Sequence, residues 1–260
     1  GYTFIGAQFD NKQNVPGLEE FFKNARIDSD KPFFYIQHTH PKDTCSAPWA
    51  WGQDDGSSTA ILSRFPNCIS FTGHSHTSLT DERTLWQGAF VSVGTASLRY
   101  ILPFGGRENS KVCNSNEKVP SQMKVHNFDD GQQGQLMTIY DNCITLDRLE
   151  ISRLDSLGRW TIALPLTGKG CSFEERGEQS VAPQFADGAS VHVTEADGKD
   201  RYGKMEHQFT VHFPAAAPTG ARAYDYEVCV EMEDIDTLKT ICTKRVFFSG
   251  SRPQAMYCAS

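Results

Sequence analysis

The sequence predicts an α/β domain followed by a small all-β sandwich, and three observations lead to this fold class. Short β-type runs alternate with two helical runs over residues 1–71, an order typical of α/β proteins. The runs that follow, up to about residue 164, are nearly all of β type. Four further β-type runs within 189–248 are separated by Gly, Asp or Pro turns, as in an antiparallel sandwich of the immunoglobulin or fibronectin type. We therefore place the first domain at residues 1–168 and the sandwich at residues 172–260.

The strands and helices of the α/β part follow from local patterns. Residues 2–6 alternate weakly, and Phe33–Ile36 is a continuous apolar run, as in a parallel strand covered on both faces. Pro16 opens a helix, because proline is favoured in the first helical turn. Turn and capping residues at 55–58 open a second helix, and Cys68–Phe71 is the next strand. Apolar residues at helical spacing mark the two helices: Leu18, Phe21, Phe22 and Ala25 in the first, and Ala60, Ile61, Leu62 and Phe65 in the second.

The later elements are predicted in the same way. Residues 104–134 are rich in Gly, Asn, Ser and Gln and indicate a long irregular loop. Asp141 and Asn142 join two β-type runs and predict a hairpin. The remaining predicted strands are Ala89–Val93, Leu136–Tyr140, Cys143–Leu149 and Trp160–Leu164 in the first domain, and Ala189–Thr194, Gln208–Phe213, Tyr224–Met232 and Ile241–Phe248 in the sandwich.

Composition and charge exclude several classes of protein. The 260 residues are 38% hydrophobic and include 17 Phe and 4 Trp, enough apolar side chains to exclude a largely disordered chain. The formal charge is −7, from 25 Lys and Arg against 32 Asp and Glu. A chain with this balance is a poor general binder of nucleic acid, because phosphate neutralisation needs clustered cations. No apolar run approaches the 18 residues of a transmembrane helix, so we expect none.

The eight cysteines contain no Cys-x-x-Cys pair, which argues against a zinc-ribbon or thioredoxin-like protein. Their number favours a secreted or periplasmic location, with a cytoplasmic one left open. The pairing is open as well. Cys229 and Cys242 are the first pair to inspect, because they lie in two predicted strands around a turn.

Four of the eight histidines fall in two tight groups, Gln37–Pro41 (Gln-His-Thr-His-Pro) and Gly73–His76 (Gly-His-Ser-His). Each group directly follows a predicted strand, and in open α/β sheets ligands gather at the carboxyl ends of the strands. Imidazole is the commonest neutral metal ligand, and a His-x-His step lets two rings reach two different ions. We therefore expect both groups to point into one crevice, with His38, His74 and His76 close enough to share metal ligation.

Several motifs between Phe33 and Ala96 resemble one protein family. They are Gln-His-Thr-His-Pro at 37–41, Trp-Ala-Trp-Gly at 49–52, Gly-His-Ser-His at 73–76 and Gln-Gly-Ala-Phe at 87–90. With them, this part of the chain resembles the C-terminal half of the calcineurin-like metallophosphoesterases, whose last metal-binding motif is Gly-His-x-His. The strands up to Trp160 look like the closing strands of that fold. The terminal strands look like the β-sandwich appended in some secreted bacterial members.

The resemblance implies a dinuclear metal site and a phosphoester substrate. On the matching positions, His38 and His74 would bind one ion and His76 the other. The ions of this family are usually Mn, Fe, Zn, Ni or Co. The implied reaction is hydrolysis of a phosphoester by a water or hydroxide activated between two ions about 3.5–4 Å apart, which also spread the charge of the transition state.

The three earlier motifs of the family, Asp-x-His, Gly-Asp-x-x-Asp and Gly-Asn-His-Asp/Glu, do not occur in the 260 residues. In the family they supply the bridging carboxylate, the remaining metal ligands and the histidine that protonates the leaving group. We therefore expect this chain to be the C-terminal part of a longer protein, with an incomplete dinuclear centre and little or no phosphatase activity of its own. The sheet edge where the missing half would pack is expected to favour self-association.

Five further residues are candidates for the substrate cleft: His40, Trp51, Asp54, Asp55 and Arg99. Each has a plainer interpretation. Among the four grouped histidines, His40 is the strongest candidate for a hydrogen-bonded histidine without a ligand. Trp51 is equally well interpreted as packing in a loop. For Asp54 and Asp55 the role of turn and capping carboxylates is favoured, and for Arg99 that of a solvated arginine.

Two other functions stay open beside the phosphoesterase. One is a non-catalytic protein that holds a carbohydrate or a cell-surface partner on its sandwich. The other is a single hydrolytic zinc ion on His38, His74 and His76, since three histidines and a water suffice for such a site. We expect no metal ligand from the predicted sandwich, because its histidines occur singly and within strands.

Overall fold

The computed structural model describes residues 1–10, 14–45, 52–99, 101, 132–152, 154–169, 172–199, 203–217, 223–233, 237 and 239–248. The chain divides into two compact units, residues 1–101 with 131–180, and residues 102–130 with 181–260. The first unit includes helix α3, which packs near strand β4: Arg176 Nη2 donates to the carbonyl of Leu85 at 2.7 Å. The boundary therefore lies after Ser180 rather than at the expected residues 168–172.

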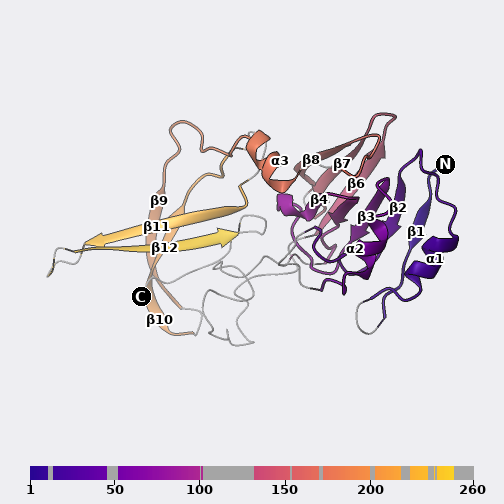
Figure 1. Cartoon of the computed structure of the whole chain (residues 1–260). Helices are drawn as coiled ribbons and strands as arrows, with labels where there is room; N and C mark the ends of the chain where they lie inside the picture. The colour runs from indigo at the N-terminus through magenta and orange to yellow at the C-terminus, as the bar shows by residue number, and fades with distance from the viewer. Residues whose placement is uncertain are drawn as a thin grey trace. The chain divides into compact units, whose positions relative to one another are not determined.

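The first unit is built on a five-stranded sheet in the order β1-β2-β3-β5-β4 (Figure 1). The first four strands in this order run parallel, and β4 pairs antiparallel with β5. Strands β2, β3 and β5 are almost fully buried, as their apolar sequences predict. Because they are parallel and adjacent, their carboxyl ends lie along one edge of the sheet. The strands are β1 (Phe4–Gly6), β2 (Phe33–Ile36), β3 (Cys68–Thr72), β4 (Leu85–Gln87) and β5 (Val91–Gly94).

Two helices, α1 (Leu18–Asn24) and α2 (Ser57–Leu62), connect the first three strands and cover one face of this sheet. Leu62 and Tyr35 are fully buried in the core between them. The same core includes Val15, Leu18, Phe22, Phe33, Ile61, Cys68 and Phe90. The strand–helix alternation expected for residues 1–71 is thus present, with parallel strands as the sequence predicts.

Strand β1 is at one edge of the sheet, and Phe4 in it is 59% exposed. The self-association expected at the sheet edge stays a prediction.

A second, three-stranded antiparallel sheet belongs to the same unit, in the order β6-β7-β8. A short 3-10 helix, η1, is hydrogen-bonded to this sheet. The carboxylate of Glu82 accepts from Arg148 Nη1 and from Trp160 Nε1, both at 2.6 Å. The bounds are η1 (Glu82–Thr84), β6 (Gln133–Ile139), β7 (Cys143–Glu150), β8 (Asp155–Ala163) and α3 (Phe173–Gln179).

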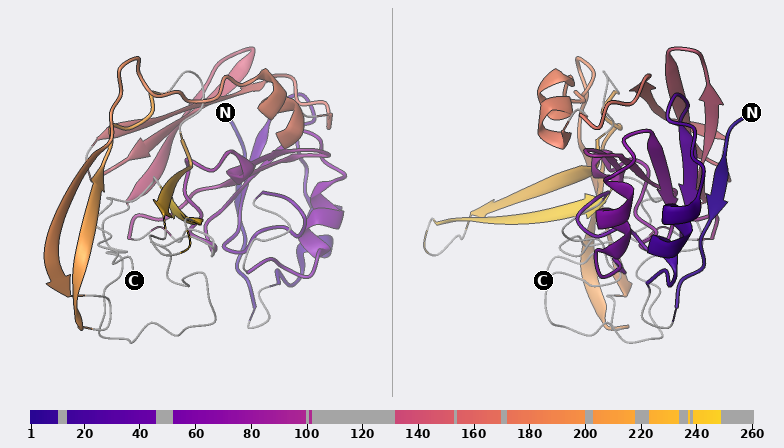
Figure 2. Two further views of the ribbon diagram at one scale, coloured as in Figure 1. Left: turned by 90° about the vertical axis from the view of Figure 1, so that its left-hand side faces the viewer. Right: turned by 45° about the vertical axis from the view of Figure 1, so that its right-hand side comes forward.

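The second unit differs from the predicted sandwich. Its described strands form two separate antiparallel pairs, β9 with β10 and β11 with β12 (Figure 2). Almost every residue of β9 is exposed, and Gln208 is the one buried residue of β10. Among the described residues, these two strands therefore lack the buried inner face of a packed sandwich. The bounds are β9 (His192–Lys199), β10 (Met205–His212), β11 (Asp225–Glu233) and β12 (Thr240–Phe248).

Three aromatic residues of this unit, Phe185, Phe213 and Tyr226, contact one another. The Phe213 and Tyr226 ring centroids are 5.1 Å apart, and Phe185 lies 6.0 Å from Tyr226. The Tyr226 hydroxyl also accepts from the Ala216 amide at 2.9 Å.

The chain as a whole is rich in sheet, and none of the described helices is long and apolar enough to cross a membrane. The predicted loop at 104–134 falls largely outside the described residues. Its last two residues already belong to β6, which begins at Gln133 rather than at Leu136. Strand β4 and helices η1 and α3 were not predicted.

Candidate metal centre

The two histidine groups meet at the carboxyl ends of β2 and β3. His38 lies two residues after β2, and His74 lies two residues after β3. The carbonyl of His38 accepts from the amides of Gly73 at 3.2 Å and His74 at 3.0 Å. Backbone pairing of the parallel strands thus continues past their ends and sets the two histidines side by side.

The side chains of His38 and His74 are in direct contact. His74 Nδ1 lies 2.6 Å from His38 Nε2, and the ring centroids are 4.5 Å apart. A hydrogen bond between two imidazole nitrogens requires one to carry a proton and the other a lone pair. His38 is exposed and His74 partly buried. Burial lowers the pKa of His74, and the nearby His38, His40 and His76 lower it further, so its neutral form is favoured.

The backbone of Gly52 fixes one side of the His74 ring. Gly52 has a φ of +76° in the left-handed region, and a Cβ placed on it would lie 1.7 Å from His74 Cδ2. Its carbonyl accepts from the His40 amide at 3.4 Å, which ties the loop before α2 to the end of β2. Only glycine combines this backbone conformation with so close an approach.

The ring of Phe9 stacks on the ring of His38, the other histidine of the pair. The two ring centroids are 5.1 Å apart with an interplanar angle of 24°. Phe9 is brought there because β1 pairs in parallel with β2, and the Ala7 amide continues the pairing by donating to the Ile36 carbonyl at 2.8 Å.

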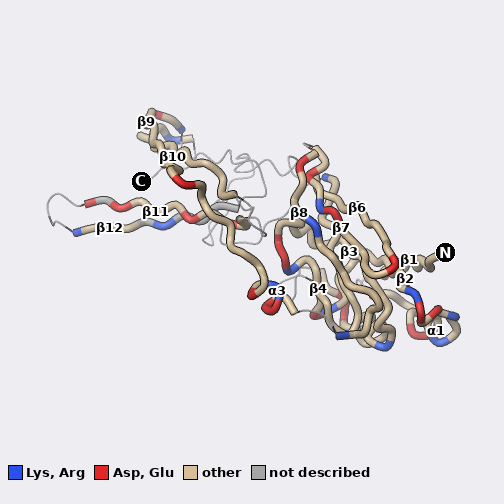
Figure 3. Tube along the Cα trace, turned by 90° about the horizontal axis from the view of Figure 1, so that it is seen from above, with Lys and Arg blue, Asp and Glu red and all other residues tan. Residues whose placement is uncertain are grey.

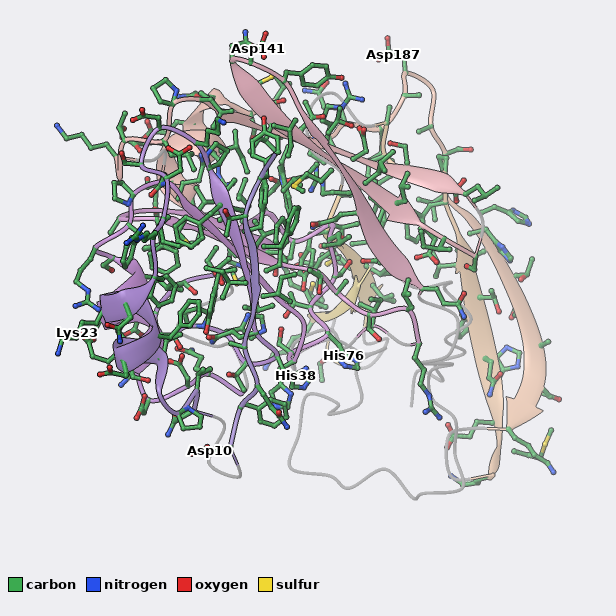
Figure 4. All side chains as sticks on the ribbon, turned by 90° about the vertical axis from the view of Figure 1, so that its right-hand side faces the viewer. Asp10, Lys23, His38, His76, Asp141 and Asp187 are labelled. Carbon is green, nitrogen blue, oxygen red and sulfur yellow. The ribbon has the colours of Figure 1, made fainter. Side chains whose placement is uncertain are left out.

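His76 completes a tight turn after β3. Its amide donates to the Gly73 carbonyl at 3.1 Å, and its own φ is 53°. Figure 4 shows His38 and His76 toward the same end of the first unit, away from Asp141 at the β6–β7 turn.

The three histidines do not form one compact ligand set. Among the described residues, the one group of three or more potential ligands whose atoms all lie within 4.8 Å of one another is Cys229, Glu231 and Cys242. A single ion held by all three histidines therefore has no support in this geometry, and the carboxylates that a dinuclear centre needs are not grouped with His38 and His74 in the described part of the chain.

His40 is a buried structural residue. Ser75 donates its amide to His40 Nε2 at 3.2 Å, so this nitrogen carries the lone pair and the proton is assigned to Nδ1. Nδ1 lies 2.7 Å from the Thr72 hydroxyl and 3.1 Å from Cys45 Sγ. Burial lowers the pKa of His40 to about 4, although the charge of Asp54 opposes this shift. His40 thus stays neutral and holds Ser75, the residue between His74 and His76.

Asp54 and Asp55 act as turn carboxylates. Asp54 is buried and accepts from the amides of Lys42 at 3.0 Å and Gly56 at 2.9 Å. Asp55 accepts from the Ser57 amide at 2.9 Å, and hydrogen bonding to Ser57 lowers the pKa of Asp55. The contacts with Gly56 and Ser57 belong to the start of α2, and the role of turn carboxylates is the interpretation that the sequence favoured.

The remaining cleft candidates are less informative. Arg99 is exposed and follows the carboxyl end of β5, with its amide donating to Ser97 Oγ at 3.1 Å. Trp51 lies outside the described residues.

Sequence reasoning missed Phe9 and Gly52. No motif marks Phe9, and its role depends on the pairing of β1 with β2. Gly52 stood in the Trp-Ala-Trp-Gly motif, but its spacing from His74 gives no signal of contact.

Comparison of the chain with protein-family models, with curated proteins and with solved structures found no match.

Proposed function

We propose that this chain carries part of the metal site of a phosphoester hydrolase, in the C-terminal half of a calcineurin-like α/β fold. One observation carries the proposal: His38 and His74, from the ends of two adjacent parallel strands, place their ring nitrogens 2.6 Å apart. Imidazole is a ligand for divalent transition-metal ions, and an ion would take the place of the proton shared by the two nitrogens, with the rings moving apart from their hydrogen-bonded spacing to bind it. The appended immunoglobulin-like sandwich is a weaker part of the proposal, because the described strands form two separate two-stranded sheets and β9 is almost entirely exposed.

The residues fit one ion better than two. His38 and His74 would hold the first ion, and His76 would contribute to the second. Neutral imidazoles do not offset the repulsion between two divalent cations, which natural sites reduce with carboxylates. We therefore propose that the chain alone binds one ion weakly and has little or no phosphatase activity.

Three neighbouring residues position the metal-binding side chains in this site. Gly52 and Phe9 hold the rings of His74 and His38, and His40 holds the turn through Ser75. When bound, a divalent ion supplies positive charge to the phosphoryl oxygens in the transition state. Nothing in the geometry selects among phosphoester substrates.

Binding of Co²⁺ followed by calorimetry and visible absorption tests the metal site. Co²⁺ on imidazole lacks the strong thiolate charge-transfer absorption that a cysteine site would give. His38→Ala and His74→Ala should each abolish this binding, whereas His192→Ala, an exposed histidine of the second unit, should leave it unchanged. Equal Co²⁺ binding by all three variants would overturn the proposal.

A second assay tests the expected low activity. With Mn²⁺ and a chromogenic phosphoester, the chain should show little turnover above the uncatalysed rate. Robust turnover that is lost in His74→Ala would show that the missing carboxylates come from elsewhere in the chain. Robust turnover that survives this substitution would place the activity at a different site.

A further inference from the structure

The β11–β12 hairpin brings two cysteines together on one face. Glu231 pairs with Cys242, and Cys229 pairs with Lys244. Because alternate residues of a strand share a face, Cys229 and Glu231 lie on the same side as Cys242 and Lys244. The two cysteines occupy diagonal positions of the antiparallel ladder.

The thiols of this pair are in contact. Cys229 Sγ lies 2.9 Å from Cys242 Sγ, and both residues are exposed. The sulfur atoms of a disulfide are about 2.05 Å apart, about 0.9 Å closer than in this contact. Exposure gives a soluble oxidant access to either sulfur.

A metal ion fits this pair less well. A zinc ion about 2.3 Å from both sulfur atoms would have an S–Zn–S angle of about 78° at their 2.9 Å separation, far from tetrahedral.

Charged side chains also pair across the two strands. Lys244 Nζ forms an ion pair with Glu227 Oε1 at 2.9 Å. Figure 3 shows that acidic residues lie along β11 and basic ones along β12, so the strands attract each other across the pair.

We propose that Cys229 and Cys242 form an intrachain disulfide that links β11 to β12. The thiolate of one cysteine attacks a small-molecule disulfide such as oxidised glutathione, forming a mixed disulfide and releasing one thiol. The second cysteine then displaces the other thiol. One S–S bond forms and one breaks, two electrons pass to the oxidant, and the two cysteine protons end on the released thiols.

The sequence makes the test direct, because trypsin cleaves after Lys239, between the two cysteines. The chain, purified without reductant and incubated with oxidised glutathione, is alkylated without reduction and digested. Peptides 223–239 and 240–244 should then appear as one linked species that reduction separates. Cys143 of β7, which has no disulfide partner among the described residues, serves as the reference for complete alkylation. Recovery of both peptides fully alkylated at Cys229 and Cys242 would overturn the proposal.

Glu231→Gln separates a disulfide from a metal site. A disulfide needs no carboxylate, so this variant should keep the linked peptides in full yield. Stoichiometric zinc in the purified chain, lost on Glu231→Gln while both thiols stay alkylatable, would show a metal site in place of the disulfide. None of these results depends on the histidines of the first unit, so the two proposals fail or hold separately.

Discussion

The histidine pair of the first unit and the cysteine pair of the second unit are held in opposite ways. His38 and His74 are positioned by buried strands, a glycine backbone and the buried His40 beneath them. Cys229 and Cys242 are positioned by the cross-strand pairing of a hairpin, and both are exposed. A side chain fixed from several sides needs no further link. A covalent bond between the cysteines would stabilise the hairpin, because it restricts the unfolded chain.

The largest expected difference is between two valines in strands. Val93 of β5 is fully buried, whereas Val193 of β9 is 49% exposed. Val93→Ala should lower the free energy of unfolding of the first unit by about 2–3 kcal/mol, from lost apolar burial plus a cavity. Val193→Ala should change the stability of its unit by less than about 0.5 kcal/mol.

Urea denaturation measures both effects. The tryptophans of the chain, at 49, 51, 86 and 160, all lie in the first unit, so their fluorescence reports its unfolding. Far-UV circular dichroism reports the strands of both units. Equal losses for the two variants would mean that β9 is covered in solution and that the second unit has an interior.

The next comparison is between two histidines only two residues apart. His40→Ala removes the partner of the Ser75 amide and of the Thr72 hydroxyl, and should cost about 2 kcal/mol of stability. His38→Ala removes an exposed side chain and should change stability by less than about 0.5 kcal/mol. His38→Ala should abolish Co²⁺ binding, whereas His40→Ala should only weaken it, through the position of the turn.

Paired urea and Co²⁺ titrations of the two variants test this separation. A His38→Ala variant as unstable as His40→Ala would contradict the assignment of His40 as the structural residue. Unchanged Co²⁺ affinity in His40→Ala would show that the turn around Ser75 keeps its position without the hydrogen bond to His40.

Substitution of Gly52 is expected to have a smaller effect on stability than substitution of His40, and Gly56 provides a matched control. Gly52→Ala strains a left-handed residue and drives a methyl group into the His74 ring, so it should cost about 1–2 kcal/mol and weaken Co²⁺ binding. Gly56→Ala shares the strain, with a φ of +98°, but its Cβ would meet nothing closer than Lys42 at 3.6 Å. Its stability should fall similarly while Co²⁺ binding stays unchanged. Equal Co²⁺ affinities for the two variants would contradict the role of Gly52 in holding His74.

The sequence predicts those parts of the fold that depend on local pattern. Phe33–Ile36 matches its predicted range, because a continuous apolar run is a local signal. The second helix is present where turn residues and apolar spacing predict it, but it ends at Leu62, before the expected Phe65. Helix α3 had such a signal, a capping box from Ser172 to Glu175, but it buries no residue and lacks an apolar stripe. Strand β4 is only three residues long and is defined by its pairing with β5.

The candidate site shows the same division. The approach of His38 to His74 follows from two strand ends in one parallel sheet, which the sequence indicates. The contacts of Gly52 and Phe9 depend on the paths of loops, which no spacing encodes. In the second unit, alternation predicts the strands, but it does not say what covers their faces, and a packed sandwich was therefore expected where β9 and β10 are exposed.

The smallest expected effect concerns His207, an exposed counterpart of the buried His40. Its Nε2 lies 3.0 Å from Glu195 and its Nδ1 lies 3.1 Å from Asp197, and these carboxylates raise the pKa of His207. A raised pKa in the folded state means that the contribution to stability is present below the ordinary histidine pKa and is lost as pH rises through the raised value. NMR titration of the His207 ring should show a lower pKa in Glu195→Gln and in Asp197→Asn. Salt at 1 M, where the screening length is about 3 Å, should lower it in the parent chain as well. An unchanged His207 pKa in both variants would mean that the β9–β10 pairing does not hold His207 beside Glu195 and Asp197 in solution. Cross-strand pairing would then be too weak to position side chains in the second unit.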